Sequence, residues 1–326
     1  MKEADVAKIL HSRGVTAVMA LLTAGGAWLA YSLGHVADIP WDRGTVLPSA
    51  NLWIGNAEAA MAVNVALTLC AAIGMLLLSR TFNLMRTVSQ LDATLFLAMS
   101  LAVPDLLCTL YTGTPLLLTL LVCLFLLYST FSEPSATPRV FLVFLLLSLG
   151  TMTQYCYAVY IPVFFIALGQ MRIFSLRTVL AAVLGLLTPW WIGLGLGLTD
   201  FSRMHWPEFV PLTSIADFGD AMYLMAVMAL SAGLLIAGWC LNFMKMLSYN
   251  AHLRAYSGTL SLLSLFTIIA VVADFPNASS YAPTLFMLSA LELCMLFVNR
   301  RKGHTAAATG AVIAVYLLLY VWDVIF

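Results

Sequence analysis

A stretch of nearly sixty residues, 140–198, contains only two charged side chains, Arg172 and Arg177. Backbone groups in so apolar a segment must pair with one another inside helices, and only lipid or other apolar helices can surround it. A short polar break at 151–154 divides its first half into two hydrophobic segments. We therefore interpret 140–198 as the centre of a membrane domain, with the two arginines in a cytoplasmic turn.

The remainder of the chain has the same apolar character. Hydrophobic residues make up 62% of the 326 residues and charged residues only 9%, whereas soluble domains have about 25% charged residues. Segments of roughly 20 apolar residues, the length that crosses a bilayer, account for almost all of the chain. The sequence therefore predicts an all-α fold: a polytopic transmembrane helical bundle of about 11 spans (10–12), forming a single transmembrane domain over 1–326.

Polar loops separate the predicted spans. Whether 140–171 is two spans or one broken element stays open at this point, because its polar break is short. The predicted spans are 14–34, 57–79, 91–110, 115–131, two between 140 and 171, 178–198, 221–244, 256–275, one that ends before 299, and 306–326.

Lysine and arginine are distributed unevenly among the predicted loops. If the N-terminus lies in the cytoplasm, thirteen of the fifteen basic residues fall on the cytoplasmic side, and only Arg43 and Arg203 lie outside. Cytoplasmic loops of membrane proteins are enriched in these residues. We therefore expect a multi-pass protein of the bacterial inner (cytoplasmic) membrane with a cytoplasmic N-terminus and a periplasmic C-terminus. Two hydrophilic loops, 35–56 and 199–220, would face the outer side.

Carboxylates gather on the predicted outer side. Selection against outer lysine and arginine explains this by itself, because it leaves aspartate and glutamate free to accumulate. The alternative is a site in which carboxylates hold a divalent cation or act as a general base toward a sugar or lipid hydroxyl. The candidate catalytic residues of such a site are Asp38, Asp42 and Asp105. Asp105 follows Pro104 just inside the predicted boundary, where a carboxylate either is functional or bonds backbone groups freed by the proline.

Polar and aromatic residues near the outer boundary are candidates for binding a lipid or substrate. Anchoring in the aromatic belt of a membrane is the alternative explanation for the tyrosines. An apolar chain would lie against the sixth and seventh spans, with its head group near the polar residues. The candidates are Gln154, Tyr155 and Tyr157 in the central stretch, and His205 and Glu208 in the second hydrophilic loop.

Several classes of ligand and partner are not predicted. The formal net charge is zero, so a nucleic acid is not expected as a partner. The six cysteines lie in apolar runs without paired spacing, which predicts neither disulfides nor a zinc site. A nucleotide-binding loop is also missing from the sequence. We therefore assign no metal ligands and no cofactor, with a divalent cation held by outer carboxylates as the alternative.

Between 83 and 198 the sequence contains several punctuating motifs: NLMRTVSQLDATLFLAMSL, Gly150 before TQY, Pro162, RIFSLR and GLLTPWW. In these motifs it resembles an uncharacterised polytopic inner-membrane protein family of Bacteroidetes. More weakly, it resembles GT-C-type glycosyltransferases that use polyprenyl-phosphate-linked sugars. The second resemblance implies a membrane glycosyltransferase-like transferase, although His35 to Asp38 stand in place of the acidic pair usual after the first span, and Gln154 in place of a lysine.

Three functions of different classes follow from these observations. The first is an envelope protein that handles a lipid-linked saccharide or lipid at the outer face, either as a GT-C-like enzyme or as a degenerate one. The second is a non-catalytic membrane scaffold subunit of an envelope assembly or secretion complex. The third is a transporter, which has the least support because no inverted repeat is visible. Membrane lipids, a polyprenyl-phosphate-linked sugar and other membrane proteins are the expected partners.

Overall fold

The computed structural model describes residues 12–37, 39, 41–42, 44–85, 90–133, 135–197, 209–212, 222–246, 249–298 and 304–325. Within these ranges the regular elements are twelve α-helices and short 3-10 helices, which confirms the predicted all-α class. The elements are α2 (Arg13–Ser32), η1 (Ala50–Leu52), α3 (Ala57–Thr81), α4 (Leu91–Leu101), α5 (Pro104–Cys108), α6 (Gly113–Tyr128), α7 (Thr137–Thr153), η2 (Tyr155–Tyr160), α8 (Ile161–Gln170), α9 (Leu176–Gly195), α10 (Met222–Met246), α11 (Ala251–Ala273), η6 (Phe275–Asn277), α12 (Ala278–Val298) and α13 (His304–Ile325).

Seven of the described helices are long and apolar enough to cross a membrane, so the chain is a multi-span helical membrane protein. The predicted count of about 11 spans is not supported. The other predicted spans correspond to shorter apolar helices of 10–17 residues. Helices are interrupted at Pro104 and at Gln154, which leaves the segments on either side shorter than a full span. The seven long spans are Arg13–Ser32, Ala57–Thr81, Leu176–Gly195, Met222–Asn242, Ala251–Ala273, Phe275–Leu296 and Ala307–Ile325.

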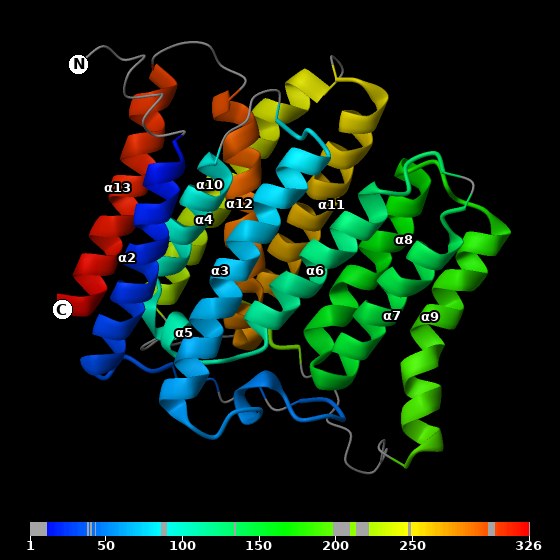
Figure 1. The fold of residues 1–326 in the computed structure, drawn as a ribbon, viewed down its shortest axis with the longest axis horizontal. Helices are drawn as coiled ribbons and strands as arrows, with labels where there is room; N and C mark the ends of the chain where they lie inside the picture. Colours follow the sequence, from blue (N-terminus) through cyan, green and yellow to red (C-terminus); the bar gives the residue numbers. More distant parts are fainter. Residues whose placement is uncertain are drawn as a thin grey trace.

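The centre of the bundle is α12, and not the predicted stretch 140–198. The span that contains α12 is buried along its entire apolar window, although it is the least apolar of the seven. Polar groups on α12, such as Ser289 and Glu292, must be shielded from lipid, which places this helix inside. The more uniformly apolar α9 lies at the edge of the bundle beside α7 (Figure 1). The more apolar helix, α9, is therefore at the edge of the bundle, and the helix with more polar residues, α12, is at its centre.

The contact between α7 and α9 depends on close packing of backbones. A Cβ atom at Gly185 of α9 would lie 2.6 Å from the backbone oxygen of Phe141 in α7. Two turns of α7 further on, the Ser148 hydroxyl donates a hydrogen bond of 2.6 Å to the Leu186 carbonyl. Small residues allow membrane helices to approach in this way, and an interhelical hydrogen bond adds to the packing.

The central stretch makes an outward and a return pass. α7 ends at Thr153, beside the predicted polar break, and the chain returns through η2 and α8. The backbone N–H of Ser132, which precedes α7, donates to the Met171 carbonyl, which follows α8, at 3.1 Å. The two ends of this segment therefore lie side by side.

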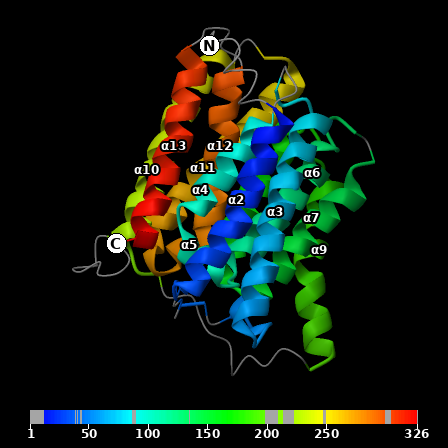
Figure 2. The same ribbon diagram turned by 60° about the vertical axis from the view of Figure 1, so that its left-hand side comes forward.

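The helices run roughly parallel to one axis, so the bundle has two ends (Figures 1 and 2). The "carboxylate end" contains Asp42, Asp105, Asp274 and Asp323, and the C-terminal end of α13 lies there (Figure 1). The opposite end, here the "arginine end", holds every arginine among the described residues. These arginines are Arg13, Arg80, Arg139, Arg172, Arg177 and Arg254.

Candidate functional site

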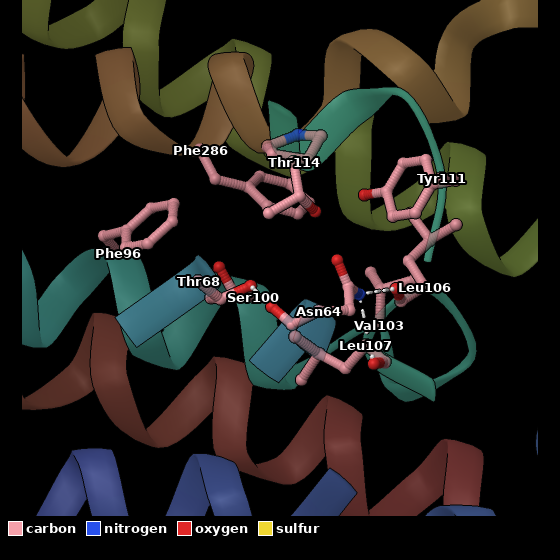
Figure 3. A pocket seen from close by; sticks show the side chains of 11 residues that line it. Asn64, Thr68, Phe96, Ser100, Val103, Leu106, Leu107, Tyr111, Thr114 and Phe286 are labelled. Carbon is pink, nitrogen blue, oxygen red and sulfur yellow. Dashed lines mark hydrogen bonds between the residues drawn. The ribbon is translucent and has the colours of Figure 1, made fainter. Parts of the chain in front are cut away.

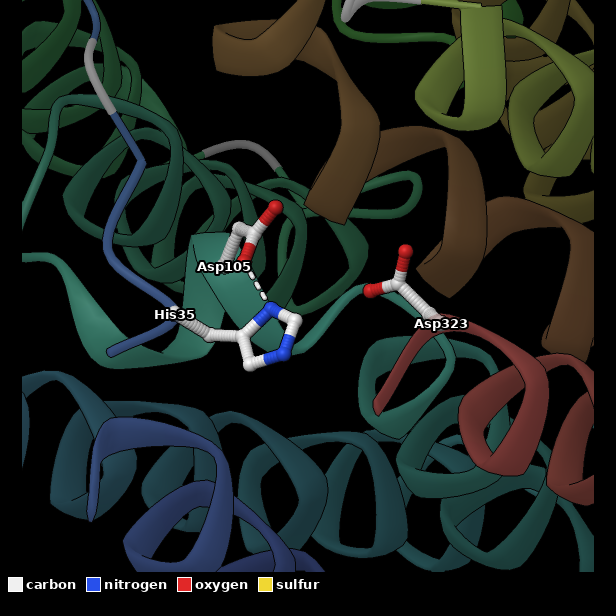
Figure 4. A group of neighbouring side chains, drawn as sticks. All are labelled: His35, Asp105 and Asp323. Atoms are coloured by element: carbon white, nitrogen blue, oxygen red, sulfur yellow. Dashed lines mark hydrogen bonds and ion pairs between the residues drawn. The ribbon is translucent and has the colours of Figure 1, made fainter. Parts of the chain in front are cut away.

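Three side chains from distant parts of the sequence meet at the carboxylate end. His35 follows α2, Asp105 lies in the short helix α5, and Asp323 lies in the last turn of α13. The His35 Nδ1 atom is 3.0 Å from Asp105 Oδ1, and one potential ligand atom from each residue lies within 4.8 Å of the others. Figure 4 shows the imidazole and the two carboxylates turned toward one another. These three residues are called the His–Asp–Asp cluster below.

The geometry of the His–Asp–Asp cluster suits a divalent cation. Two ligand atoms at about 2.1 Å from one ion and 90° apart lie about 3.0 Å from each other, which is the separation of His35 Nδ1 and Asp105 Oδ1. Opposed ligands of one ion lie about 4.2–4.8 Å apart for bonds of 2.1–2.4 Å. The Oδ2 atom of Asp323 is buried and has no hydrogen-bond partner among the described residues. Imidazole and carboxylate together are ligands that Zn²⁺ and Mn²⁺ accept.

Hydrogen bonds from other helices hold Asp105 in place. The Asn64 side chain of α3 donates to the carbonyls of Leu106 and Leu107, at 2.8 and 3.1 Å, and so fixes α5 from one side. The Cys108 thiol at the end of α5 donates to the Ala27 carbonyl of α2 at 3.3 Å. Because α5 has only five residues, these contacts from neighbouring helices set its position.

Tyr223 of α10 connects the two helices that carry the carboxylates. Its hydroxyl lies 2.6 Å from the Ala102 carbonyl at the end of α4 and 2.9 Å from the Leu319 carbonyl of α13. Ala102 precedes α5, and Leu319 lies one turn before Asp323. The hydroxyl therefore sets the distance between Asp105 and Asp323.

A small cavity of about 20 Å³ with a mostly apolar wall lies behind α5, where α4 ends (Figure 3). Ser100, Tyr111 and Thr114 contribute hydroxyl groups to its wall. Asn64 is fully buried, and its Oδ1 atom has no hydrogen-bond partner among the described residues. The volume is sufficient for one water molecule with several polar partners. Asn64 was not predicted as a site residue, although a polar amide within an apolar span was the signal that could have identified it.

Asp42 lies apart from the His–Asp–Asp cluster and fastens the first loop to α6. Its carboxylate accepts hydrogen bonds from the Thr112 N–H at 2.9 Å and from the Thr112 hydroxyl at 2.6 Å. Its own carbonyl accepts from the Ser49 hydroxyl and the Asn51 amide. Asp42 is 2% exposed, and burial raises the pKa of its carboxyl group against the effect of the Thr112 hydrogen bonds. The structure thus uses this candidate catalytic residue as a helix-terminal acceptor.

Gln154 and Tyr155 belong to a second polar network at the same end. The Gln154 amide donates to the Asn277 Oδ1 atom at 3.3 Å, and the Tyr155 hydroxyl donates to Asp274 Oδ1 at 3.1 Å. Asp274 also accepts from the Tyr281 hydroxyl at 3.2 Å. Burial raises the pKa of the Asp274 carboxyl group, and its hydrogen bonds act in the opposite direction. Asp274 and Asn277, which were not predicted as site residues, therefore connect the central stretch to η6.

The other predicted binding residues have different surroundings. Tyr157 is 3% exposed, and its ring packs directly over Gly150 of α7. Asp38, His205 and Glu208 lie outside the described residues. Asp105 is thus the predicted catalytic residue that the structure places in the His–Asp–Asp cluster, and Gln154 and Tyr155 are brought together in the second network.

Compared with known proteins, the chain matches no family model, no curated protein sequence and no solved structure. The resemblance to GT-C-type enzymes therefore stays a prediction.

Proposed function

We propose that the chain is an integral inner-membrane protein of the cell envelope that handles a lipid-linked saccharide or lipid phosphate at the outer face. In this proposal a divalent cation, held by the His–Asp–Asp cluster, receives the phosphate. The observation that supports it is the convergence of His35, Asp105 and Asp323, which lie in three elements far apart in the sequence, at one end of the bundle.

The distribution of charge supports an outer location for this cluster. All described arginine side chains lie at the arginine end, and none of the described residues at the carboxylate end is a lysine or an arginine. Because basic residues are retained on the cytoplasmic side, the carboxylate end is assigned to the periplasm. In this orientation the shorter helices α4–α5, α6, α7 and η2–α8 would complete the crossings, for a total of 11.

Labelling of single cysteines tests the orientation. A cysteine in place of Gly55, an exposed loop position of the carboxylate end with no atom near its Cβ, should react with an impermeant thiol reagent in intact spheroplasts. A cysteine in place of Ser135, an exposed position of the arginine end, should react only after lysis. The parent protein, with its native cysteines, gives the background. Labelling at position 135 alone in intact spheroplasts would reverse the orientation.

A phosphate at the carboxylate end requires a cation. Two carboxylates at the cluster repel an anionic phosphate, and the described residues nearby provide no lysine or arginine to offset that repulsion. A divalent cation bound by His35, Asp105 and Asp323 would provide positive charge and polarise a phosphoryl oxygen. Without an ion, the His35 imidazole and the Asp105 carboxylate orient each other through their hydrogen bond. A bound cation would replace the proton between them, and Asp323 would complete the donor set.

Binding of Mn²⁺ to the purified protein tests the cluster. Loss of the free-ion electron paramagnetic resonance signal should show one bound Mn²⁺ per chain, and Asp323→Asn should weaken binding by at least ~10-fold because it removes a ligand. Glu58→Gln is the matched control, since this exposed carboxylate lies at the same end of the bundle, in the first turn of α3, outside the cluster. Equal Mn²⁺ affinity of the parent and the Asp323→Asn variant would contradict the cation site.

Lipid retention then separates the proposed handling function from a scaffold. Retention of added polyprenyl phosphate should depend on Mn²⁺ and should be lost in Asp323→Asn but kept in Glu58→Gln. If Mn²⁺ binds but the polyprenyl phosphate is retained equally with and without it, the cluster is a structural metal site and a scaffold becomes the better description.

A further inference from the structure

An apolar groove lies between α10 and α11, near the carboxylate end of the bundle. Its cavity volume is about 160 Å³, and all ten of its lining residues are apolar. Leu285 of α12 is 1% exposed and forms the floor, whereas Val272 of α11 is 46% exposed and lies at the rim. The groove is therefore open on the side that faces away from the bundle.

Two facing stripes of side chains produce the groove. On α10 the lining positions are 225, 228, 229 and 232, and on α11 they are 268, 271 and 272, with Phe275 following in η6. This spacing of three and four residues puts each set on one face of its helix. Helices packed at such stripes normally fill the space between them. Here Ala229 and Ala232 are too small to do so, and Met225 and Met228 have flexible side chains that adapt to an irregular neighbour.

The end of the groove near the carboxylate end is closed and bordered by polar groups. Leu212 lines the cavity, and the Phe275 N–H donates to the Val210 carbonyl at 3.1 Å, which holds this short segment over the end of the groove. Asp274, beside Phe275, belongs to the network with Tyr155. The groove therefore has an apolar interior along the helices and a polar boundary where the helices end.

We propose that this groove binds one acyl chain of a membrane phospholipid. The walls and floor belong to candidate membrane spans, so the open side faces the hydrocarbon layer, where lipid chains are the molecules that can fill an apolar space. A cavity of about 150 Å³ lined by apolar side chains accepts small hydrocarbons and stays free of water, so a segment of an acyl chain fits this volume.

Asp274 beside the end of the groove does not select a head group. It is 1% exposed, and its carboxylate accepts hydrogen bonds from Tyr155, Asn277 and Tyr281. The apolar lining and the volume of the groove suit the acyl chain and leave the head group outside. This inference does not rest on the function proposed above, because the groove and the His–Asp–Asp cluster share no residue.

Native mass spectrometry of the purified protein tests the proposal. The protein is incubated with an equimolar mixture of phosphatidylethanolamine, phosphatidylglycerol and polyprenyl phosphate, and the retained lipid is identified by mass. We expect the parent protein to retain one phospholipid, with either head group, because only the acyl chain enters the groove. The Ala232→Phe variant, in which a ring occupies the groove, should retain at least ~10-fold less, because added volume in a tight cavity excludes its occupant.

Two further variants make the result specific. Ala237→Phe adds the same ring at an exposed position of α10 outside the groove lining and should retain lipid as the parent does. Val272→Trp fills the groove from the opposite wall and should reproduce the loss, even if Ala232→Phe alters the packing of α10. Equal retention by the parent and both filled variants would overturn the site. Selective retention of polyprenyl phosphate would overturn the proposed occupant.

Discussion

Replacing Asp42 by alanine is expected to lower the free energy of unfolding by about 2–4 kcal/mol, because the Thr112 N–H and hydroxyl would both lose a charged acceptor. The carboxylate also lies at the N-terminal end of α6, where the helix dipole favours a negative charge. Burial of the charge offsets part of the stabilisation by the carboxylate, and it also raises the pKa of Asp42. The expected loss of unfolding free energy is therefore smaller than the sum of two charged hydrogen bonds.

The loss would extend beyond Thr112, because Asp42 belongs to a loop that is tied to the end of α7. The N–H groups of Thr45, Val46 and Leu47 donate to the carbonyls at 152 and 153. Gly44 allows the turn between them, since its φ of +78° and the nearby Leu47 carbonyl exclude a side chain. Loosening Asp42 should therefore release the loop from two helices at once.

Thermal unfolding in detergent, followed by circular dichroism, measures the effect of Asp42→Ala. A fall in the apparent midpoint of roughly 5 °C or more corresponds to the expected free energy. Asp42→Asn should recover about half of the lost midpoint, because one amide oxygen can accept well from only one of the two Thr112 donors. Glu58→Gln, an exposed change at the same end, should leave the midpoint unchanged. An Asp42→Ala midpoint equal to that of the parent would show that the loop is held without this carboxylate.

Gly150→Val should destabilise the protein by about 3 kcal/mol, the upper part of the range for overpacking of a tight interior. A Cβ at this position of α7 would meet the ring of Tyr157 well inside van der Waals distance. The ring is 3% exposed and lies on the 3-10 segment that reverses the chain, so it has little room to move. The substitution should therefore separate η2 from α7.

The matched control for Gly150→Val is Gly233→Val in α10, where a Cβ would meet no atom within 4 Å. Both changes add the same side chain to a helix, so the difference between their unfolding midpoints isolates the contact with Tyr157. A second test is Gly150→Val combined with Tyr157→Ala, which should recover part of the loss. Equal midpoints for the two single valine variants would show that Tyr157 rotates away without cost.

Composition was sufficient to predict the class of fold, but not the number of complete spans. The run 91–110 was predicted as one span, yet it is α4 and α5 with a break before Pro104, because proline has no N–H and disfavours a helical residue before it. The role of α12 was also hidden. Its serines, threonines and Glu292 did not set it apart from the other predicted spans, whereas burial of these polar groups makes it the central helix.

The site was predictable only in part, because it depends on contacts across the bundle. Asp105 was identified from its position after a proline near the membrane boundary. Asp323 lies 218 positions later in the sequence, and no local pattern connects it with Asp105 or His35. Asp42 was predicted as a catalytic residue from its residue type and position. Its contacts show instead that it accepts hydrogen bonds from Thr112 at a helix terminus.

The short helices on one side of the bundle have a consequence for the surrounding bilayer. α6 and α7 contain 16 and 17 residues, which corresponds to about 24–26 Å at 1.5 Å per residue, against a hydrocarbon layer of about 30 Å. A lipid layer in contact with this flank must become thinner to match it, whereas α3, with 25 residues, fits a layer of full thickness. The protein would therefore sit in a membrane of uneven depth, with head groups drawn inward beside α6 and α7 and less hydrocarbon between the two aqueous phases there.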